Sequence, residues 1–565
     1  MDPNPGTVGD AGSGAGGDGD GAGGSGGQRW VDAVALDSLR RRGAVAVKLP
    51  GRQIALFVAR DGAVHACSNR CPHEGYPLAE GALDDCGVLT CHWHNWKFDI
   101  RSGANLYGGD ALRIYPARIA GDRVEVELSD PPPAERQAQL LGRFDAAMAD
   151  EDRPRIAREL ARLEAAGAGP ELALARAIAT SHDRLRYGMT HAYAGADAWL
   201  RLRDLLADPA QRLACATEAM GHIARDTLRE PAWPYTDDER PWDTAAFLAA
   251  VEAQDETGAL ARLQGALATG VGFDALLPVL AEAALAHYND FGHSLIYLGH
   301  LRSLVARLGP GVARPLLRAW LRALVYATRE DLLPDFVAYA PALAAWPAAP
   351  CTGAPPATDA AALCGLSVRH TVAALLRAAA QAQPTQLLDA LAEAGGLHLL
   401  RFDERHAIRI DAPVADNVGW LDFSHALTFA QALRGVAGRT PALWPRGLLQ
   451  MALFVGRNTP YLDDGVTAEA ALSRWSPAAA AGRADAEAAG AAAGLIDHGL
   501  GLDIFPVHRV KTWLAVHDSL AAGPPESTTR ALRAALNRLL AARFKQRHTL
   551  RAARQALAGV AREAG

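Results

Sequence analysis

Two short segments that carry cysteine and histidine constrain this chain more than any other feature. They read Cys71-Pro72-His73 and Cys91-His92-Trp93-His94. Thiolates and imidazoles at this spacing form a metal site, and zinc accepts such a ligand set. The order Cys-x-His then Cys-x-x-His is, however, the one needed by a [2Fe–2S] cluster that has two thiolates on one iron and two imidazoles on the other. We therefore predict that Cys71, His73, Cys91 and His94 hold this cluster, with a zinc knuckle as the alternative.

The segment 65–109 resembles Rieske ferredoxins and the Rieske domains of ring-hydroxylating dioxygenases and small nitrite reductase subunits. Gly75, Gly81 and Gly87 lie around the two ligand segments, and Trp96 and Phe98 follow the second. The resemblance extends over residues 30–128 and implies a small all-β domain that transfers one electron at a time.

The resemblance also implies a subtype. High-potential Rieske proteins carry an extra cysteine in each loop, whereas Tyr76 and Trp93 take those positions here. The hydroxyl residue usual after the second loop is absent, because Asn95 and Trp96 follow His94. Fewer hydrogen bonds to the sulfurs lower the potential. We expect the low-potential, ferredoxin-like class, with the outer edges of both histidine rings facing solvent or a partner.

The chain divides by composition. Residues 1–28 are rich in glycine and contain too few apolar side chains to form a core, so we expect a disordered leader. Alternating strand patterns predict the iron–sulfur domain at residues 29–130, and Pro131–Ala134 predicts a stiff linker. In residues 135–565, Ala, Leu, Arg and Glu recur at helical spacing. The predicted fold is thus multidomain: a small all-β domain followed by a large, mostly α-helical domain of one or two lobes.

A Rieske cluster performs no bond chemistry alone, so the helical domain is expected to donate, accept or use electrons. No G-x-G-x-x-G follows a strand, which disfavours a flavin or nicotinamide domain. A non-haem iron held by two histidines and a carboxylate is the other option. The candidates are Asp290, His293 and His300, and the pair Asp422 and His425. We expect some of His293, His300, His425 and His508 to converge on a metal or substrate, although any one of them is more often structural.

The stretch Trp420–Arg434 is faintly similar to questin oxidase-like proteins, which are large helical proteins linked to oxidative ring cleavage of aromatic polyketides. This likeness implies an oxygenase-like domain with a small aromatic substrate.

Charge and hydropathy exclude other classes. The net charge is −6, which gives no support to nucleic-acid binding. The sequence contains no uncharged run of 18 apolar residues, so we expect no helix that crosses a membrane. Seven cysteines at irregular spacing and no secretory pattern lead us to expect a cytoplasmic protein.

Two hypotheses follow. In the first, the chain is an oxidoreductase, a component of a Rieske-type monooxygenase or dioxygenase, and its cluster relays electrons from an external reductase to the helical domain. In the second, it is a non-catalytic electron carrier for a partner oxygenase, and the helical domain is a docking or oligomerisation module. The second hypothesis predicts that no histidines converge and no pocket opens in the helical domain.

Overall fold

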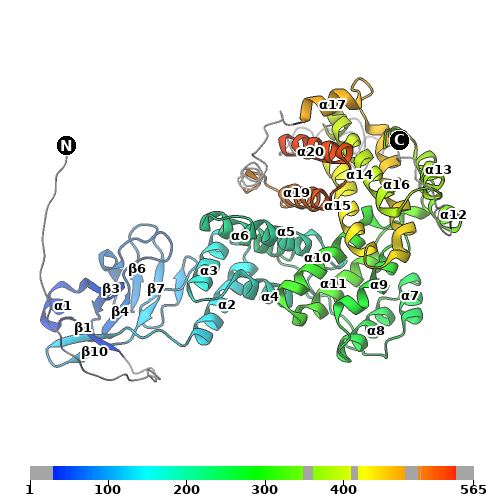
Figure 1. Cartoon of the computed structure of the whole chain (residues 1–565). Helices are drawn as coiled ribbons and strands as arrows, with labels where there is room; N and C mark the ends of the chain where they lie inside the picture. Colours follow the sequence, from blue (N-terminus) through cyan, green and yellow to red (C-terminus); the bar gives the residue numbers. More distant parts are fainter. Residues whose placement is uncertain (1–28, 348–359, 409–417, 477–493, 497, 543–565) are drawn as a thin grey trace, which may run out of the picture. The chain divides into compact units, whose positions relative to one another are not determined.

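A computed structural model describes residues 29–347, 360–408, 418–476, 494–496 and 498–542. The predicted disordered leader therefore lies outside the described residues. The chain forms two compact units, residues 1–136 and 137–565 (Figure 1).

The N-terminal unit consists of short antiparallel strands and one helix, α1 (Leu36–Arg42). The strands are β1 (Trp30–Ala35), β2 (Ala44–Leu49), β3 (Arg52–Val58), β4 (Val64–Ser68), β5 (Ala82–Leu83), β6 (Val88–Thr90), β7 (Lys97–Asp99), β8 (Asn105–Tyr107), β9 (Ile114–Tyr115), β10 (Ala117–Ala120) and β11 (Arg123–Glu127). They form three sheets with the orders β1-β11-β10, β2-β3-β4-β9 and β5-β6-β7-β8.

Alternation along the strands places the cores of this unit. Val124 and Val126 of β11 are fully buried, whereas Glu125 between them is partly exposed. The central strand β3 is buried on both faces from Ile54 to Phe57, because one hydrophobic cluster lies on each side of it. The β4 end and the β6–β7 hairpin present the two ligand segments, so the sheets fix the segments' positions.

The second unit is helical, as predicted. Its helices are α2 (Pro133–Ala149), α3 (Arg153–Ala165), α4 (Pro170–Ser181), α5 (His191–Asp204), α6 (Pro209–Asp226), α7 (Thr244–Glu252), α8 (Glu256–Ala268), α9 (Phe273–Ala284), α10 (His293–Leu308), α11 (Ala313–Tyr326), α12 (Tyr339–Ala344), α13 (Val368–Ala379), α14 (Pro384–Arg401), α15 (Trp420–Ala437), α16 (Trp444–Asn458), α17 (Ala468–Trp475), α19 (Ile504–Ala521) and α20 (Glu526–Ala541). The helix α2 begins within the segment predicted to be a linker. None of the described helices has the length and apolar character needed to cross a membrane.

Four helices pack in a closed ring in this unit. The helix α5 contacts α10, α10 contacts α15, α15 contacts α19, and α19 returns to α5. All four are largely buried, which explains why their sequences are apolar on most faces. A ring of this kind encloses an interior to which each helix can contribute side chains.

Candidate metal centres

The two ligand loops of the N-terminal unit close in the same way. The amide of Cys71 donates to the carbonyl of Tyr76, and the amide of Cys91 donates to that of Trp96, at 2.9 and 2.8 Å. Four residues after each cysteine the backbone is left-handed, at Gly75 (φ 79°) and Asn95 (φ 60°). Glycine and asparagine tolerate this conformation best, so the sequence itself shapes both loops.

The loops bring the four predicted ligands together. Nδ1 of His73 lies 3.1 Å from Nδ1 of His94, which is a separation suited to two imidazoles on one iron. Both cysteines are buried, and burial raises the pKa of the Cys71 thiol to about 11. A cation is therefore needed to hold this sulfur as a thiolate. His94 is exposed and His73 is partly exposed, as expected for an electron exit.

Two tryptophans cover the histidine ligands. The ring of Trp96 stacks on His73 with centroids 4.6 Å apart, and the exposed Trp93 stacks on His94 at 5.1 Å. The rings of Tyr76 and Trp93 face each other at 5.6 Å. The two residues predicted to take the places of the extra cysteines thus lie beside each other.

Comparison with known proteins agrees with this geometry. Residues 29–111 match the Rieske [2Fe-2S] domain. Over 110 residues the chain is 34% identical to the ferredoxin component of the alkene monooxygenase system of Xanthobacter autotrophicus. The matched region covers 19% of this chain and 88% of that protein. The chain belongs to the Rieske [2Fe–2S] family.

Two further relatives have the same motif-bearing region. One is the 4beta-methylsterol monooxygenase of Methylococcus capsulatus, 38% identical over 73 residues, 13% of this chain and 20% of that protein. The other is the structure of a putative NADH-dependent nitrite reductase small subunit from Mycobacterium tuberculosis, 30% identical over 18% of this chain and 98% of that chain, with a TM-score of 0.18. The family assignment does not depend on this structural likeness. The Rieske domain implies a [2Fe–2S] cluster on its two cysteines and two histidines.

The helical unit contains a second cluster of possible ligands, which we call the four-histidine site: His191, His293, His425 and His508. Each residue comes from a different helix of the ring α5, α10, α15 and α19. Nε2 of His293 lies 3.0 Å from Nε2 of His191 and 2.8 Å from Nε2 of His425. Nε2 of His425 lies 3.4 Å from Nε2 of His508. Metal–nitrogen bonds of about 2.0–2.1 Å place neighbouring ligand nitrogens about 3.0–3.4 Å apart, so these separations fit one metal ion.

The other ring nitrogens explain why the Nε2 atoms face inward. Nδ1 of His425 donates to the carbonyl of Leu421 at 2.5 Å, and Nδ1 of His508 donates to that of Ile504 at 2.6 Å. Because Nδ1 carries the proton, Nε2 of each neutral ring has a free lone pair. Such outer contacts are typical of histidines that bind metals.

The other two rings have side-chain contacts at Nδ1. The carboxylate of Asp290 lies 3.5 Å from Nδ1 of His293, and the hydroxyl of Tyr297 lies 3.4 Å from Nδ1 of His191. Hydrogen bonding to His293 lowers the pKa of Asp290, which keeps this carboxylate ionised. Asp290 therefore acts on the site through His293.

The burial of these imidazoles and the repulsion between their lone pairs favour the binding of a cation at this site. Burial, followed by repulsion from neighbouring groups, lowers the pKa of His191, His425 and His508 well below the usual value. Three of the rings are thus neutral at pH 7. Lone pairs that converge within 4.8 Å repel one another unless a cation lies between them.

Helix starts set the positions of two ligands. Thr190 begins α5, because its hydroxyl accepts from the amide of Ala192 at 3.2 Å and donates to Asp226 at 2.5 Å. His191 is therefore the first residue of α5. His293 is likewise the first residue of α10, after three consecutive left-handed residues, Asp290–Gly292. Left-handed backbone at Phe291 is unusual, and such strain often accompanies functional sites.

The structure brings together only part of the predicted set. His293 and His425 are in the four-histidine site, with His508, whose convergence was also expected. Asp290 contacts His293, but the cluster in the described part of the helical unit contains four imidazoles and no carboxylate. This grouping differs from the expected arrangement of two histidines and one carboxylate.

His300 and Asp422 lie outside the cluster. His300 shares a face of α10 with His293, but seven residues separate them by about 10 Å along the axis. Its Nδ1 instead contacts Asp197 at 2.7 Å. Asp422 accepts from the amide of Gly419 at 2.8 Å and so caps the start of α15, and burial raises its pKa.

Sequence reasoning missed His191 and Lys511. His191 follows a threonine that caps a helix, which was the available signal, but no spacing motif links it to ligands on other helices. Lys511 follows His508 by one turn of α19 and is 2% exposed, and its Nζ has no partner among the described residues. Burial lowers its pKa to about 7, so part of this lysine is a neutral amine at neutral pH and can accept a proton.

Proposed function

We propose that this chain is an oxidoreductase in which the Rieske domain passes electrons from an external reductase to a non-haem iron held by the four-histidine site. There, dioxygen would be used to oxidise a small aromatic substrate. The observation that carries the proposal is the convergence of four imidazoles in the helical unit of a chain that also has a one-electron centre.

The electron source favours iron over zinc at this site. Imidazoles bind zinc, copper, nickel and iron. Zinc does not change its oxidation state, so it has no use for electrons from a Rieske cluster. When bound, a redox metal supplies one-electron chemistry and an open position for dioxygen.

The surrounding side chains have roles that the contacts define. The carbonyls of Leu421 and Ile504 orient His425 and His508. Asp290 orients His293 and adds a negative charge beside the site. The burial of His293, His425 and His508 lowers the local dielectric, which strengthens these interactions.

Named relatives support the electron-transfer part. The Xanthobacter relative is the ferredoxin of an alkene monooxygenase system, and the Methylococcus relative is a sterol monooxygenase. We infer that this chain also serves an oxygenation reaction. The aromatic substrate follows from the questin oxidase-like stretch Trp420–Arg434, which contains His425, and this part stays a prediction.

The competing proposal is a carrier whose helical unit only docks or oligomerises. That reading expects no converging histidines and no pocket in the helical unit. The four-histidine site and the cavity beside it favour the catalytic reading.

Iron and acid-labile sulfide per chain test the proposal directly. We expect about three irons and about two sulfides in the full chain. His508→Ala should leave about two irons and both sulfides, whereas Cys91→Ser should leave about one iron and no sulfide. His517→Ala is the matched control, since His517 is an exposed residue of the same helix, and it should retain all the iron.

Two results would contradict the proposal. One is about two irons in the full chain with no loss in His508→Ala, which would support the carrier. The other is zinc at the four-histidine site of chains produced with iron available, which would exclude electron use there.

A further inference from the structure

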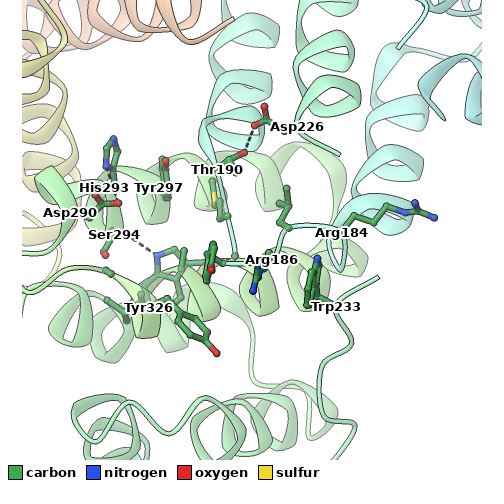
Figure 2. A pocket seen from close by; sticks show the side chains of 18 of the residues that line it. Arg184, Arg186, Thr190, Asp226, Trp233, Asp290, His293, Ser294, Tyr297 and Tyr326 are labelled. Carbon is green, nitrogen blue, oxygen red and sulfur yellow. Dashed lines mark hydrogen bonds and ion pairs between the residues drawn. The ribbon is translucent and has the colours of Figure 1, made fainter. Parts of the chain in front are cut away.

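A cavity of about 520 Å³ opens beside the four-histidine site. Its lining includes Asp290, His293 and Tyr297, which we call the inner end, and the loop before α5 with Trp233, which we call the outer end. Figure 2 shows the two ends apart, with His293 and Asp290 on one side and Arg184 and Trp233 on the other. The volume lies within the range of small-molecule sites, about 300–1,000 Å³.

The outer end presents an arginine that aromatic rings hold in place. The guanidinium of Arg186 lies 4.9 Å from the ring centre of Trp233 and 5.1 Å from that of Tyr187. Tyr187 in turn contacts Tyr326 edge to face at 5.7 Å. In the described part of the chain no carboxylate pairs with Arg186.

Neighbouring arginines differ from Arg186 in this respect. Arg322 pairs with Glu256 at 2.8 Å, and Arg318 pairs with Asp237 at 2.9 Å. Arg186 is exposed and has no such carboxylate partner among the described residues, so its donors are available to a ligand. A planar guanidinium is suited to bind a carboxylate through two hydrogen bonds.

The carboxylate of Asp290 lines the inner end and lies 3.5 Å from Nδ1 of His293. An acidic side chain at this position disfavours an anion there. A ligand with one acidic group would therefore direct that group to the outer end, and place its uncharged aromatic body between the rings of the cavity, facing His293.

We propose that this cavity binds a flat aromatic carboxylate, with the carboxylate on Arg186 and the opposite end of the ring system toward His293. The orientation of the ring system toward a reacting metal rests on the proposed function, since it assumes a metal at the four-histidine site. The binding preference itself does not, because Arg186, Tyr187 and Trp233 are separate from the metal ligands.

Binding of matched ligand pairs tests the proposal. The probes are benzoate, naphthalene-2-carboxylate and anthracene-2-carboxylate, each beside its neutral amide, titrated calorimetrically into the full chain. We expect at least one carboxylate to bind more tightly than its amide. Arg186→Gln should weaken the binding of that carboxylate about ten- to a hundredfold, because a charged hydrogen-bond pair is lost. The affinity for the amide should change less than about twofold. Arg530→Gln, an exposed arginine paired with Glu469 on other helices, should change neither.

The outcomes separate this proposal from the proposed function. If no carboxylate is preferred over its amide, or if Arg186→Gln weakens both equally, the carboxylate site is wrong even in a chain that contains a third iron. If the preference persists in His508→Ala and in a full chain that has no third iron, the binding site stands and the iron-dependent function fails.

Discussion

At the scale of single residues, the two metal centres are prepared in different ways. In the Rieske loops the backbone closes around ligands that are two or three residues apart. In the four-histidine site, each imidazole depends on the atom behind its Nδ1, such as the carbonyl of Leu421 for His425. Changing a group that only orients a ligand should thus weaken metal binding without removing a donor.

The first prediction concerns the Rieske potential. Tyr76 takes the place of a cysteine, and its hydroxyl donates to Glu80 at 3.0 Å. Asn95 follows His94 at the position where a hydroxyl residue would strengthen hydrogen bonding to sulfur. We expect a midpoint potential near the lower end of the Rieske range, about −150 mV. A redox titration followed by electron paramagnetic resonance measures it, and a value near +300 mV, the upper end, would contradict the assignment to the low-potential class.

The second prediction concerns His287, which joins two acidic side chains near the turn before α10. Its Nδ1 lies 2.9 Å from the buried Asp331 and its Nε2 lies 3.0 Å from Glu252. The hydrogen bond to Asp331 raises the pKa of His287. Its stabilising effect is therefore complete below the unfolded value of about 6.5 and is lost as pH rises through the higher folded pKa.

His287→Gln should consequently lower the free energy of unfolding more at pH 5.5 than at pH 8.5, by about 1–2 kcal/mol. Thermal unfolding followed by the helical circular dichroism signal measures the difference at both pH values. His517→Gln, an exposed histidine on α19, is the control. An equal loss at both pH values would mean that the ion pairs of His287 do not contribute.

At the scale of elements, the start of α10 is the most constrained point of the site. Gly292 has φ 72°, and a Cβ there would lie 2.5 Å from the ring of Phe429. Arg457 lies over the Phe291 ring at 3.6 Å, and the amide of Asp290 donates to the carbonyl of Thr328 at 3.1 Å. These contacts hold three left-handed residues directly before His293.

The third prediction compares two glycines of this region. Gly292→Ala should cost about 2–4 kcal/mol and displace His293, with loss of the third iron while helical content remains. Gly299→Ala, inside α10, meets only the Cβ of Ala432 at 3.8 Å. It should be neutral or stabilise by up to about 1 kcal/mol. Unfolding midpoints and iron content decide, and retention of iron in Gly292→Ala would show that the turn does not position the ligand.

Sequence reasoning succeeded where ligands are close along the chain. Cys71 to His73 and Cys91 to His94 form a local motif, so the Rieske domain and its ligands followed from spacing. The four-histidine site has no such motif, because His293 is 102 residues from His191 and 132 residues from His425. His300 was a candidate beside His293 and shares a face of α10 with it, but seven residues of helix separate the two by about 10 Å along the axis.

At the scale of the whole molecule, the chain combines an electron-transfer unit and a helical unit that has the features of a metal site. The fold of each unit follows from its composition: alternating strands before Pro131, and alanine- and leucine-rich helices after Pro133. The proposed function depends on both units being active in the same protein.

The fourth prediction tests whether electrons leave the cluster for the helical unit. The anaerobic protein is reduced with dithionite, freed of excess reductant and mixed with dioxygen. Re-oxidation of the cluster, followed by its visible absorbance, should be faster in the unmodified chain than in His508→Ala, because the four-histidine iron would accept electrons first. His517→Ala should behave as the unmodified chain. Equal rates in all three proteins would indicate that the cluster serves a separate acceptor.

The distribution of the four histidines along the chain has a consequence for biosynthesis. A ribosome completes the Rieske loops early, but the last imidazole, His508, emerges only after α5, α10 and α15 have been made. A nascent chain can therefore hold its iron–sulfur ligands long before it can hold the second metal. Under the proposed function, the metal site of the helical unit would therefore be completed after the Rieske ligands.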